Sequence, residues 1–191
     1  ESNQLKTTGN MQLIDSYGGN IKECYQAYLQ QTFAGMGKIS LAVDPLWGSY
    51  SDYAPDVLRS LGHLVISNSY LHNGIKAFPD DLESYSSDPH KEKNLEHLIE
   101  VMRGSNNRKF GLDFGAAFDG DGDRAKFIDD HGNIVSEDEI TAIIAKYVIK
   151  EHKKKYGQNS RPKIIAEIKS SKLVEDAVEG AGGKLVREQT G

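Results

Sequence analysis

Three aspartates alternate with glycines in the stretch from Asp119 to Asp123, and Arg124 follows directly. In an extended loop, a spacing of two residues places alternate side chains on one side, so the three carboxylates should face one point. At ~4 Å, two carboxylates repel by about 1 kcal/mol in water and about 4 kcal/mol near a partly shielded protein surface. A cation would cancel this repulsion, and oxygen ligands without nearby Cys or His favour Mg²⁺ or Ca²⁺ over zinc. The spacing therefore predicts a metal site formed by Asp119, Asp121 and Asp123.

The residues on either side of these acids bear on the same prediction. Arg124 adds a planar guanidinium, as bidentate contact with a phosphate ester requires. The alternative is a solvated acidic turn. An apolar run ends directly at Asp119, which places the acids at the tip of a strand that we expect to be buried. The members of this run are Leu112, Phe114, Ala116, Ala117 and Phe118. Its position favours a metal site over a solvated turn.

Composition narrows the class of protein. The formal net charge of −5 argues against a nucleic-acid partner, because binding to a phosphate backbone relies on clustered Lys and Arg. The single cysteine, Cys24, cannot form an internal disulfide, which fits a reducing compartment. No apolar run approaches the ~18 residues of a membrane span. We expect a cytosolic protein with no membrane partner. Because the chain starts at Glu1 and stops at Gly191 in mid-pattern, we expect it to be an excised fragment.

The segments before the acidic loop alternate between helical and strand patterns. Apolar residues at helical spacing predict a helix over 20–33 and another over 94–103, and a helix over 52–61 should turn Leu58 and Leu61 inward. Strands are predicted over 38–44 and 63–68. A long connection over 70–90 separates these elements from the second half, and loops of this length tend to be functional or mobile.

The segments after the acidic loop continue the alternation. A return strand is predicted over 125–129, followed by a turn and the pair Ile134-Val135. Ser136 and Glu139 have the spacing of a capping box and start a helix. Its apolar positions are Ile140, Ile143, Ile144, Tyr147 and Val148. The whole pattern predicts an α/β fold with a mostly parallel sheet covered by helices, in which ligands collect at the carboxyl ends of strands.

The same patterns suggest how the chain is divided. We predict a linker or the tail of a preceding domain over residues 1–17, and an α/β domain carrying the metal loop over 18–157. A linker follows over 158–162. Residues 163–191 then open with strand, helix and strand patterns, which predict the truncated start of a second, similar α/β unit.

Several known metal loops share part of the acidic pattern. An EF-hand also has Asp at positions 1, 3 and 5, but it needs Gly and Glu where this chain has Arg124 and Asp130. A phosphatase of the haloacid-dehalogenase type runs an apolar strand into D-x-D-G, with Asp119 as nucleophile and Asp121 as acid. Its later Lys and paired-Asp motifs cannot be placed in this chain. A non-catalytic Mg²⁺ or Ca²⁺ binding module also stays open.

The stretch from Gly115 to Arg124 resembles the metal loop of the phosphohexomutases, closest to the bacterial phosphomannomutase/phosphoglucomutase group. The resemblance covers residues 37–191 and corresponds to the second domain of that family and the start of the third. Further stretches that agree in order are Val43-Asp44 through Gly48, Leu58 to Gly62, Phe78-Pro79, Asp88-Pro89 with Asn94-Leu95, Ile164 to Ser171, and Gly182 to Gly191. The chain departs from the family at Leu46-Trp47-Gly48, where His-Gly is frequent, and it has no phosphoserine motif of the form T-A-S-H-N-P.

The resemblance implies a mutase that moves phosphate between the 1- and 6-positions of a hexose through a phosphoserine enzyme and a bisphosphorylated sugar. Asp119, Asp121 and Asp123 would be Mg²⁺ ligands, and Arg124 and Lys169 would contact the phosphorylated hexose. Lys169 could equally be a solvated strand end. The partners would be the missing first and fourth domains and the remainder of the third. Whether the sugar is a mannose, glucose or glucosamine phosphate stays open. The histidines are expected at the surface and not as ligands: His72, His90, His97 and His131.

Overall fold

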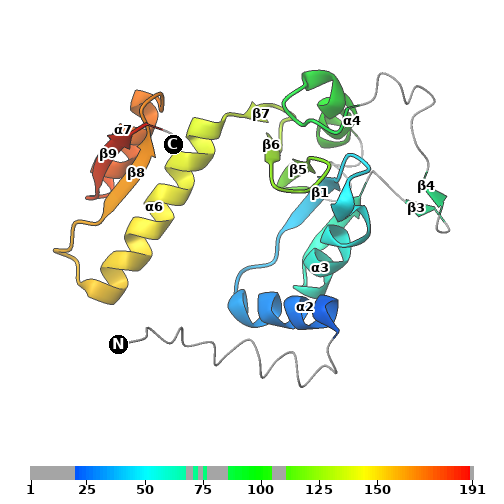
Figure 1. The fold of residues 1–191 in the computed structure, drawn as a ribbon, viewed down its shortest axis with the longest axis horizontal. Helices are drawn as coiled ribbons and strands as arrows, with labels where there is room; N and C mark the ends of the chain where they lie inside the picture. The colour runs from blue at the N-terminus through cyan, green and yellow to red at the C-terminus, as the bar shows by residue number, and fades with distance from the viewer. Residues whose placement is uncertain (1–19, 68–70, 73–74, 77–85, 105–110, 190–191) are drawn as a thin grey trace, which may run out of the picture. The chain divides into compact units, whose positions relative to one another are not determined.

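The computed structural model describes residues 20–67, 71–72, 75–76, 86–104 and 111–189 (Figure 1). The chain divides into two compact units, residues 1–133 and 134–191, each of which is described by itself. The tail predicted over 1–17 lies outside the described residues, as does most of the connection predicted over 70–90. Within that connection two short antiparallel strands occur, β3 (Leu71–His72) and β4 (Ile75–Lys76), which the sequence analysis did not predict.

The first unit is built on a sheet in which the strands β2, β1, β5 and β6 lie in that order. Strand β1 (Ser40–Asp44) pairs in parallel with β2 (Leu64–Ser67) and with β5 (Phe114–Phe118). Strand β6 (Ala125–Asp129) returns antiparallel to β5, and the chain passes through β7 (Ile134–Val135) into the second unit. Asp44 lies opposite Ala117, so β1 and β5 end side by side. The predicted α/β class with a mostly parallel sheet is confirmed.

Helices cover both faces of this sheet, so side chains on both sides of its central strands are buried, as Leu41, Ala42 and Val43 of β1 are. On one face, Leu58 of α3 (Ala54–Ser60) packs against a cluster formed by Leu41, Val43 and Val65. On the other face lies α4 (Glu92–Arg103), which buries Leu95, Leu98, Val101 and Met102. At Gly115 of β5, an added Cβ would lie 3.1 Å from Leu98 Cδ1. The short 3₁₀ helix η1 (Ser49–Asp52) leads from the end of β1 into α3.

Helix α2 (Ile21–Thr32) forms where the sequence predicts it, but a different face is buried. Its buried residues are the small Cys24 and Ala27. Of the larger apolar residues at helical spacing, Leu29 is half-buried and the others are exposed. These exposed positions are Ile21, Tyr25, Tyr28 and Phe33. Small residues let a helix approach its neighbour closely, and the rings stack at the surface, where Tyr25 lies 6.0 Å from Tyr53 between centroids.

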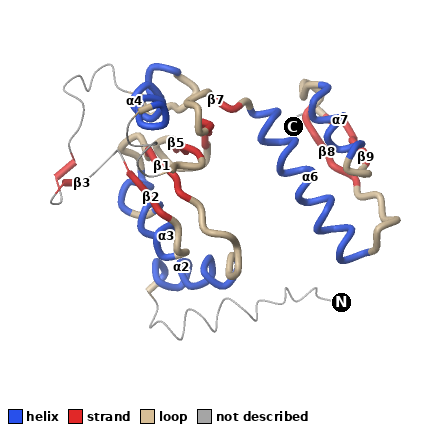
Figure 2. The backbone as a smooth tube through the Cα atoms, turned by 180° about the vertical axis from the view of Figure 1, so that it is seen from behind, coloured by secondary structure: helices blue, strands red, loops and turns tan. Residues whose placement is uncertain are grey.

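The second unit contains α6 (Glu137–Tyr156), α7 (Lys172–Gly180) and the parallel pair β8 (Lys163–Glu167) and β9 (Lys184–Glu188) (Figure 2). Its core joins Ala145 and Ile149 of α6 to Val174 and Val178 of α7. Helix α6 therefore belongs to this unit, and the chain divides between 133 and 134 and not over 158–162 as predicted.

The prediction placed α6 in the first unit because it relied on apolar positions of α6 that are mostly exposed in the structure. The large apolar residues of α6 are exposed, whereas Ala142, Ala145 and Ile149 are buried. The exposed residues are Ile143, Ile144, Tyr147 and Val148. The capping box is confirmed, since Ser136 accepts from the Glu139 backbone N–H and Glu139 accepts from that of Ser136.

Across the described part of the chain, no helix combines the length and apolar character needed to cross a bilayer.

Candidate metal centre

The acidic loop lies at the carboxyl end of β5, beside the end of β1. It is not extended, as the sequence analysis assumed, but curls into a tight turn. The Gly122 N–H donates to the Asp119 carbonyl (3.2 Å) and the Asp119 N–H donates to the Arg124 carbonyl (3.2 Å). Gly122 has a φ of +78°, which glycine adopts without strain. This turn brings the predicted acids together: carboxylate oxygens of Asp119, Asp121 and Asp123 all lie within 4.8 Å of one another.

The three carboxylates stand in different surroundings. Asp119 is only 1% exposed, and both of its oxygens accept hydrogen bonds from Arg124. The Arg124 backbone N–H reaches Oδ1 at 3.1 Å and the guanidinium Nε reaches Oδ2 at 2.6 Å. A buried charge needs such partners, because otherwise its desolvation would be too costly. Asp121 and Asp123 are exposed and open to a ligand. Asp119 is therefore a fixed anchor beside two accessible carboxylates.

The titration of these groups reflects how closely they are placed. Burial alone would raise the pKa of Asp119, but hydrogen bonds from the Arg124 backbone and side chain outweigh it and lower that pKa to about 2. The pKa of Asp123 is raised, first by its hydrogen bond to Asp119 and then by the charges of Asp121 and Asp119. The charges of Asp121 and Asp119 thus disfavour ionisation of Asp123, and a divalent cation would relieve this repulsion.

Arg124 is held between two carboxylates. Besides Asp119, its Nη1 lies 3.4 Å from Asp88 Oδ1, and its Nε lies 3.7 Å from Oδ1 of the exposed Asp123. The hydrogen bond to Asp119 and then the charges of these carboxylates raise the pKa of Arg124. No partner for Nη2 occurs among the described residues, and half of the side chain is exposed. A planar fork fixed on one edge and open on the other can accept an anionic oxygen.

Asp88 is a site residue that the sequence analysis did not select. The His90 backbone N–H donates to its carboxylate (3.0 Å), and this bond is the first cause of its lowered pKa. The Asn94 amide donates to the Asp88 carbonyl (2.8 Å), so the first turn of α4 fixes this loop. The pair Asp88-Pro89 followed by Asn94 just inside a predicted helix was the available signal, since Asp-Pro pairs and Asn side chains organise turns.

Lys169, the other predicted catalytic residue, is 85% exposed and lies in the second unit, 3.9 Å from Glu167. The acidic loop belongs to the first unit, so Lys169 is described here only within its own unit. Its own loop is fixed from β9, because Arg187 Nη1 donates to the Ser170 carbonyl (2.5 Å) and Arg187 Nη2 pairs with Glu175 (3.1 Å).

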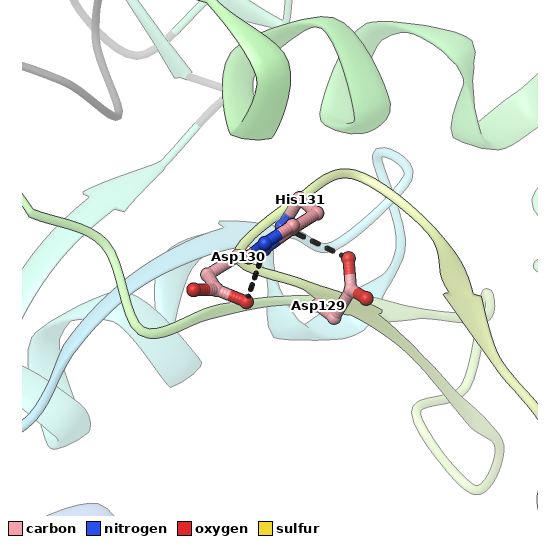
Figure 3. Close-up of side chains that lie close together, drawn as sticks. All are labelled: Asp129, Asp130 and His131. Carbon is pink, nitrogen blue, oxygen red and sulfur yellow. Dashed lines mark hydrogen bonds and ion pairs between the residues drawn. The ribbon is translucent and has the colours of Figure 1, made fainter.

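A second group of possible ligands lies in the turn after β6 and comprises Asp129, Asp130 and His131 (Figure 3). Asp129 already has a structural role, since its carboxylate accepts from the backbone N–H groups of His131 (2.9 Å) and Asn133 (2.7 Å). The His131 ring lies 2.8 Å from Asp130, and both are exposed. These bonds close the turn and account for the cluster without a metal. His131 lies at the surface as predicted, and so do His90 and His97.

The acidic loop, by contrast, fits a hard divalent cation. It offers three carboxylates, one anchored and two exposed, in a group that includes no Cys or His. Mg²⁺ and Ca²⁺ prefer oxygen donors of this kind. The fold and the loop together define an α/β protein with three clustered carboxylates at the carboxyl ends of parallel strands, which is where open α/β sheets bind ligands.

Sequence comparison shows which family has this arrangement. Residues 15–132 match "phosphoglucomutase/phosphomannomutase, alpha/beta/alpha domain II" and residues 136–191 match domain III of the same family. The chain belongs to the phosphoglucomutase/phosphomannomutase family. The junction between the two matches agrees with the division at 133 and 134 in the structure.

Individual relatives and a solved structure also come from the phosphoglucomutase/phosphomannomutase family. The chain is 31% identical over 184 residues to a phosphomannomutase of Methanocaldococcus jannaschii, covering 95% of this chain and 36% of the relative. It is 30% identical over 172 residues to a phosphomannomutase/phosphoglucomutase of Pseudomonas syringae, covering 90% of this chain and 33% of the relative. A phosphoglucomutase/phosphomannomutase family protein of Burkholderia thailandensis has the same fold, with a TM-score of 0.71, 21% identity, and coverage of 90% of this chain and 33% of its own. This chain thus spans about a third of the length of these relatives.

Proposed function

We propose that this chain is the metal-loop portion of a phosphohexomutase that interconverts hexose 1-phosphate and 6-phosphate through a phosphoserine enzyme and a bisphosphorylated sugar. The observation that carries the proposal is the convergence of Asp119, Asp121 and Asp123 beside Arg124, in a chain that belongs to the phosphoglucomutase/phosphomannomutase family. Relatives include proteins named for mannose, glucose and glucosamine phosphates, so the substrate class is a phosphorylated hexose.

In this proposal the three aspartates hold Mg²⁺, and the phosphoserine oxygen, from outside residues 1–191, completes the site. Bound there, Mg²⁺ would neutralise charge on the phosphoryl group during transfer. The protein's own part is to hold the ligands still. Asp119 is fixed by two hydrogen bonds from Arg124, and the turn from Asp119 to Gly122 sets the direction of the other two carboxylates.

Arg124 takes a different role, in contact with the phosphoryl group. Asp119 and Asp88 hold its Nε and Nη1, which points the remaining edge of the guanidinium at the space beside the carboxylates. Lys169, exposed at the end of β8, contacts the sugar phosphate. Binding of the substrate then depends on fixed charges, and little side-chain rearrangement is needed at Arg124.

The test is turnover of glucose 1-phosphate against Mg²⁺ concentration, in the full-length enzyme that contains this chain. Asp121→Ala leaves two repelling carboxylates, so its lost rate should return partly at high Mg²⁺. Arg124→Ala loses a charge-assisted contact worth about 1.5–3 kcal/mol, so turnover should fall roughly ten- to a few hundred-fold without rescue by Mg²⁺. Arg124→Lys should recover only part of the rate, because a point charge does not reproduce the bidentate fork.

Two results would overturn the proposal. If high Mg²⁺ restored Arg124→Ala to the wild-type rate, Arg124 would only shape the metal loop. The chain alone should show neither mutase nor phosphatase activity. Steady release of phosphate from p-nitrophenyl phosphate by residues 1–191, abolished by Asp119→Asn, would instead assign Asp119 as a phosphatase nucleophile.

A further inference from the structure

Residues 45–50, which follow β1 and run into η1, lie directly against the acidic loop and are called the β1 turn here. Strands β1 and β5 are parallel neighbours in register, Asp44 opposite Ala117, so the segments that leave their carboxyl ends must run side by side. The Ser49 backbone N–H donates to the Gly120 carbonyl at 2.8 Å. This hydrogen bond joins the backbone of the β1 turn to the backbone of the loop that carries the three aspartates.

Gly48 has no room for a side chain. An added Cβ would lie 2.6 Å from the Asp119 carbonyl oxygen, 2.8 Å from the Gly120 carbonyl oxygen and 2.9 Å from Gly120 Cα. All three are backbone atoms of the acidic loop, which cannot rotate away as a flexible side chain could. The backbone of Gly48 itself (φ −75°, ψ −173°) is an extended conformation that any residue adopts. Glycine is therefore required here for close approach and not for its conformational freedom.

Tyr50 makes a second contact with the same loop. Its ring lies where a side chain of Gly122 would be, since an added Cβ there would be 2.7 Å from Tyr50 Cε1 and 2.8 Å from Cζ. The ring also meets Phe118 edge-on, with 5.4 Å between centroids. Gly120 and Gly122 are the two residues that separate the three aspartates. The β1 turn thus touches the loop at both of its spacers.

The β1 turn is itself firmly fixed. Leu46 and Trp47 both have positive φ, at 46° and 54°, which non-glycine residues adopt only when their surroundings impose it. The Leu46 N–H donates to the buried Asp44 carboxylate (2.9 Å), and the Gly48 N–H donates to the Pro45 carbonyl (2.8 Å). Asp44 and Leu46 are 3% and 1% exposed. A turn held this tightly can set the position of the backbone that lies against it.

We propose that Gly48 and Tyr50 are positioning residues for the metal centre, and that they set the path of the loop so that the carboxylates of Asp121 and Asp123 meet that of Asp119. This inference rests on the proposed metal-binding function. Residues that orient metal ligands typically change metal affinity ten- to a hundred-fold when they are replaced. Gly48→Ala must push the Asp119–Gly120 backbone away, so it should weaken Mg²⁺ binding by about that factor.

The experiment is calorimetric titration of Mg²⁺ into the chain, with the fold checked by far-UV circular dichroism. Gly37→Ala is the neutral control, because nothing lies within 4 Å of an added Cβ at Gly37. Gly115→Ala is the structural control, because its added Cβ would crowd Leu98 of α4 and no atom of the acidic loop. Gly115→Ala should lower the urea midpoint and leave the dissociation constant for Mg²⁺ unchanged. Gly48→Ala should raise that constant at least about ten-fold.

Tyr50 provides an independent pair of variants should Gly48→Ala not fold. Tyr50→Phe keeps the ring against Gly122 and Phe118 and should bind Mg²⁺ like the wild type, whereas Tyr50→Ala should bind it more weakly. Equal affinity in wild type, Gly48→Ala and Tyr50→Ala would overturn the positioning role. Absence of Mg²⁺ binding by the wild type would instead overturn the proposed metal centre, so the two failures are distinct.

Discussion

Arg124 shows how one residue can serve two neighbours at once. It neutralises Asp119, which is almost wholly buried, and it also reaches Asp88 at the start of the α4 segment. The bond from the guanidinium Nε to Asp119 is short (2.6 Å) and charge-assisted, and hydrogen bonds of that kind are about twice as strong as neutral ones. A buried carboxylate can therefore stay ionised at the metal centre while the guanidinium keeps an open edge.

Asp129 offers a test at the residue scale that is independent of the metal loop. Burial would raise its pKa, but hydrogen bonds from Asn133 and His131 outweigh it and lower that pKa below 3.8. A lowered pKa in the folded state stabilises the fold above the unfolded value, and this stability is lost as pH falls through the folded value. The difference in free energy of unfolding between wild type and Asp129→Asn should thus be constant near neutral pH and shrink below about pH 4.

Urea denaturation at several pH values between 7 and 3 measures this difference. Asp130→Asn is a suitable control, because Asp130 is an exposed neighbour in the same turn and pairs with the exposed His131 ring. A difference between wild type and Asp129→Asn that grew on acidification would contradict the assigned role of Asp129 in the turn.

The sequence alone identified the three clustered aspartates but not the residues that surround them in the fold. The spacing of Asp119, Asp121 and Asp123 was enough to predict that they converge, because short glycine-separated spacings leave few alternatives. The ion pair of Arg124 with Asp88 joins residues 36 apart in the chain, and Gly48, which lies against the Asp119 backbone, is 71 residues away from it; no local pattern encodes either contact.

Among the elements, the start of α6 shows in detail the hydrogen bonds that the sequence predicts. Ser136 and Glu139 form the reciprocal capping bonds that the motif S-x-x-E predicts. Ser136→Ala should cost about 1 kcal/mol in the free energy of unfolding of the second unit. Ser171 is a matched control, because it occupies the same N-cap position of α7 but its side chain makes no cap hydrogen bond. Equal losses in Ser136→Ala and Ser171→Ala, measured by urea denaturation, would show that the capping box contributes nothing.

The faces of the helices were harder to predict than their positions. Helix α4 has one apolar stripe and buries it, whereas α2 and α6 carry large apolar residues around much of their surface. In α6 the small Ala142 and Ala145 are buried, because they let α7 approach closely. Periodicity ranks positions by size and hydrophobicity, so it selected the large exposed residues and missed the small buried ones.

For the whole molecule, the structure assigns α6 to the second unit, and this assignment can be tested with two core substitutions. Ile149→Ala and Leu98→Ala each empty a fully buried site and should each cost about 2–5 kcal/mol. Ile149→Ala should speed amide hydrogen exchange in α6, α7, β8 and β9 but not in β1 and β5, and Leu98→Ala should speed it in α4, β1 and β5 but not in β8 and β9. Faster exchange in β1 and β5 upon Ile149→Ala would return α6 to the first unit, as the sequence predicted.

The central claim is that the acidic loop binds Mg²⁺, and calorimetric titration of Mg²⁺ into residues 1–191 tests it most directly. Three carboxylates without the phosphoserine oxygen should bind weakly. Asp121→Asn removes one charged ligand and should abolish the measured heat, whereas Asp130→Asn, in the other acidic cluster, should leave it unchanged. Equal heats from wild type and Asp121→Asn, or loss of heat in Asp130→Asn alone, would contradict the assignment of the metal centre.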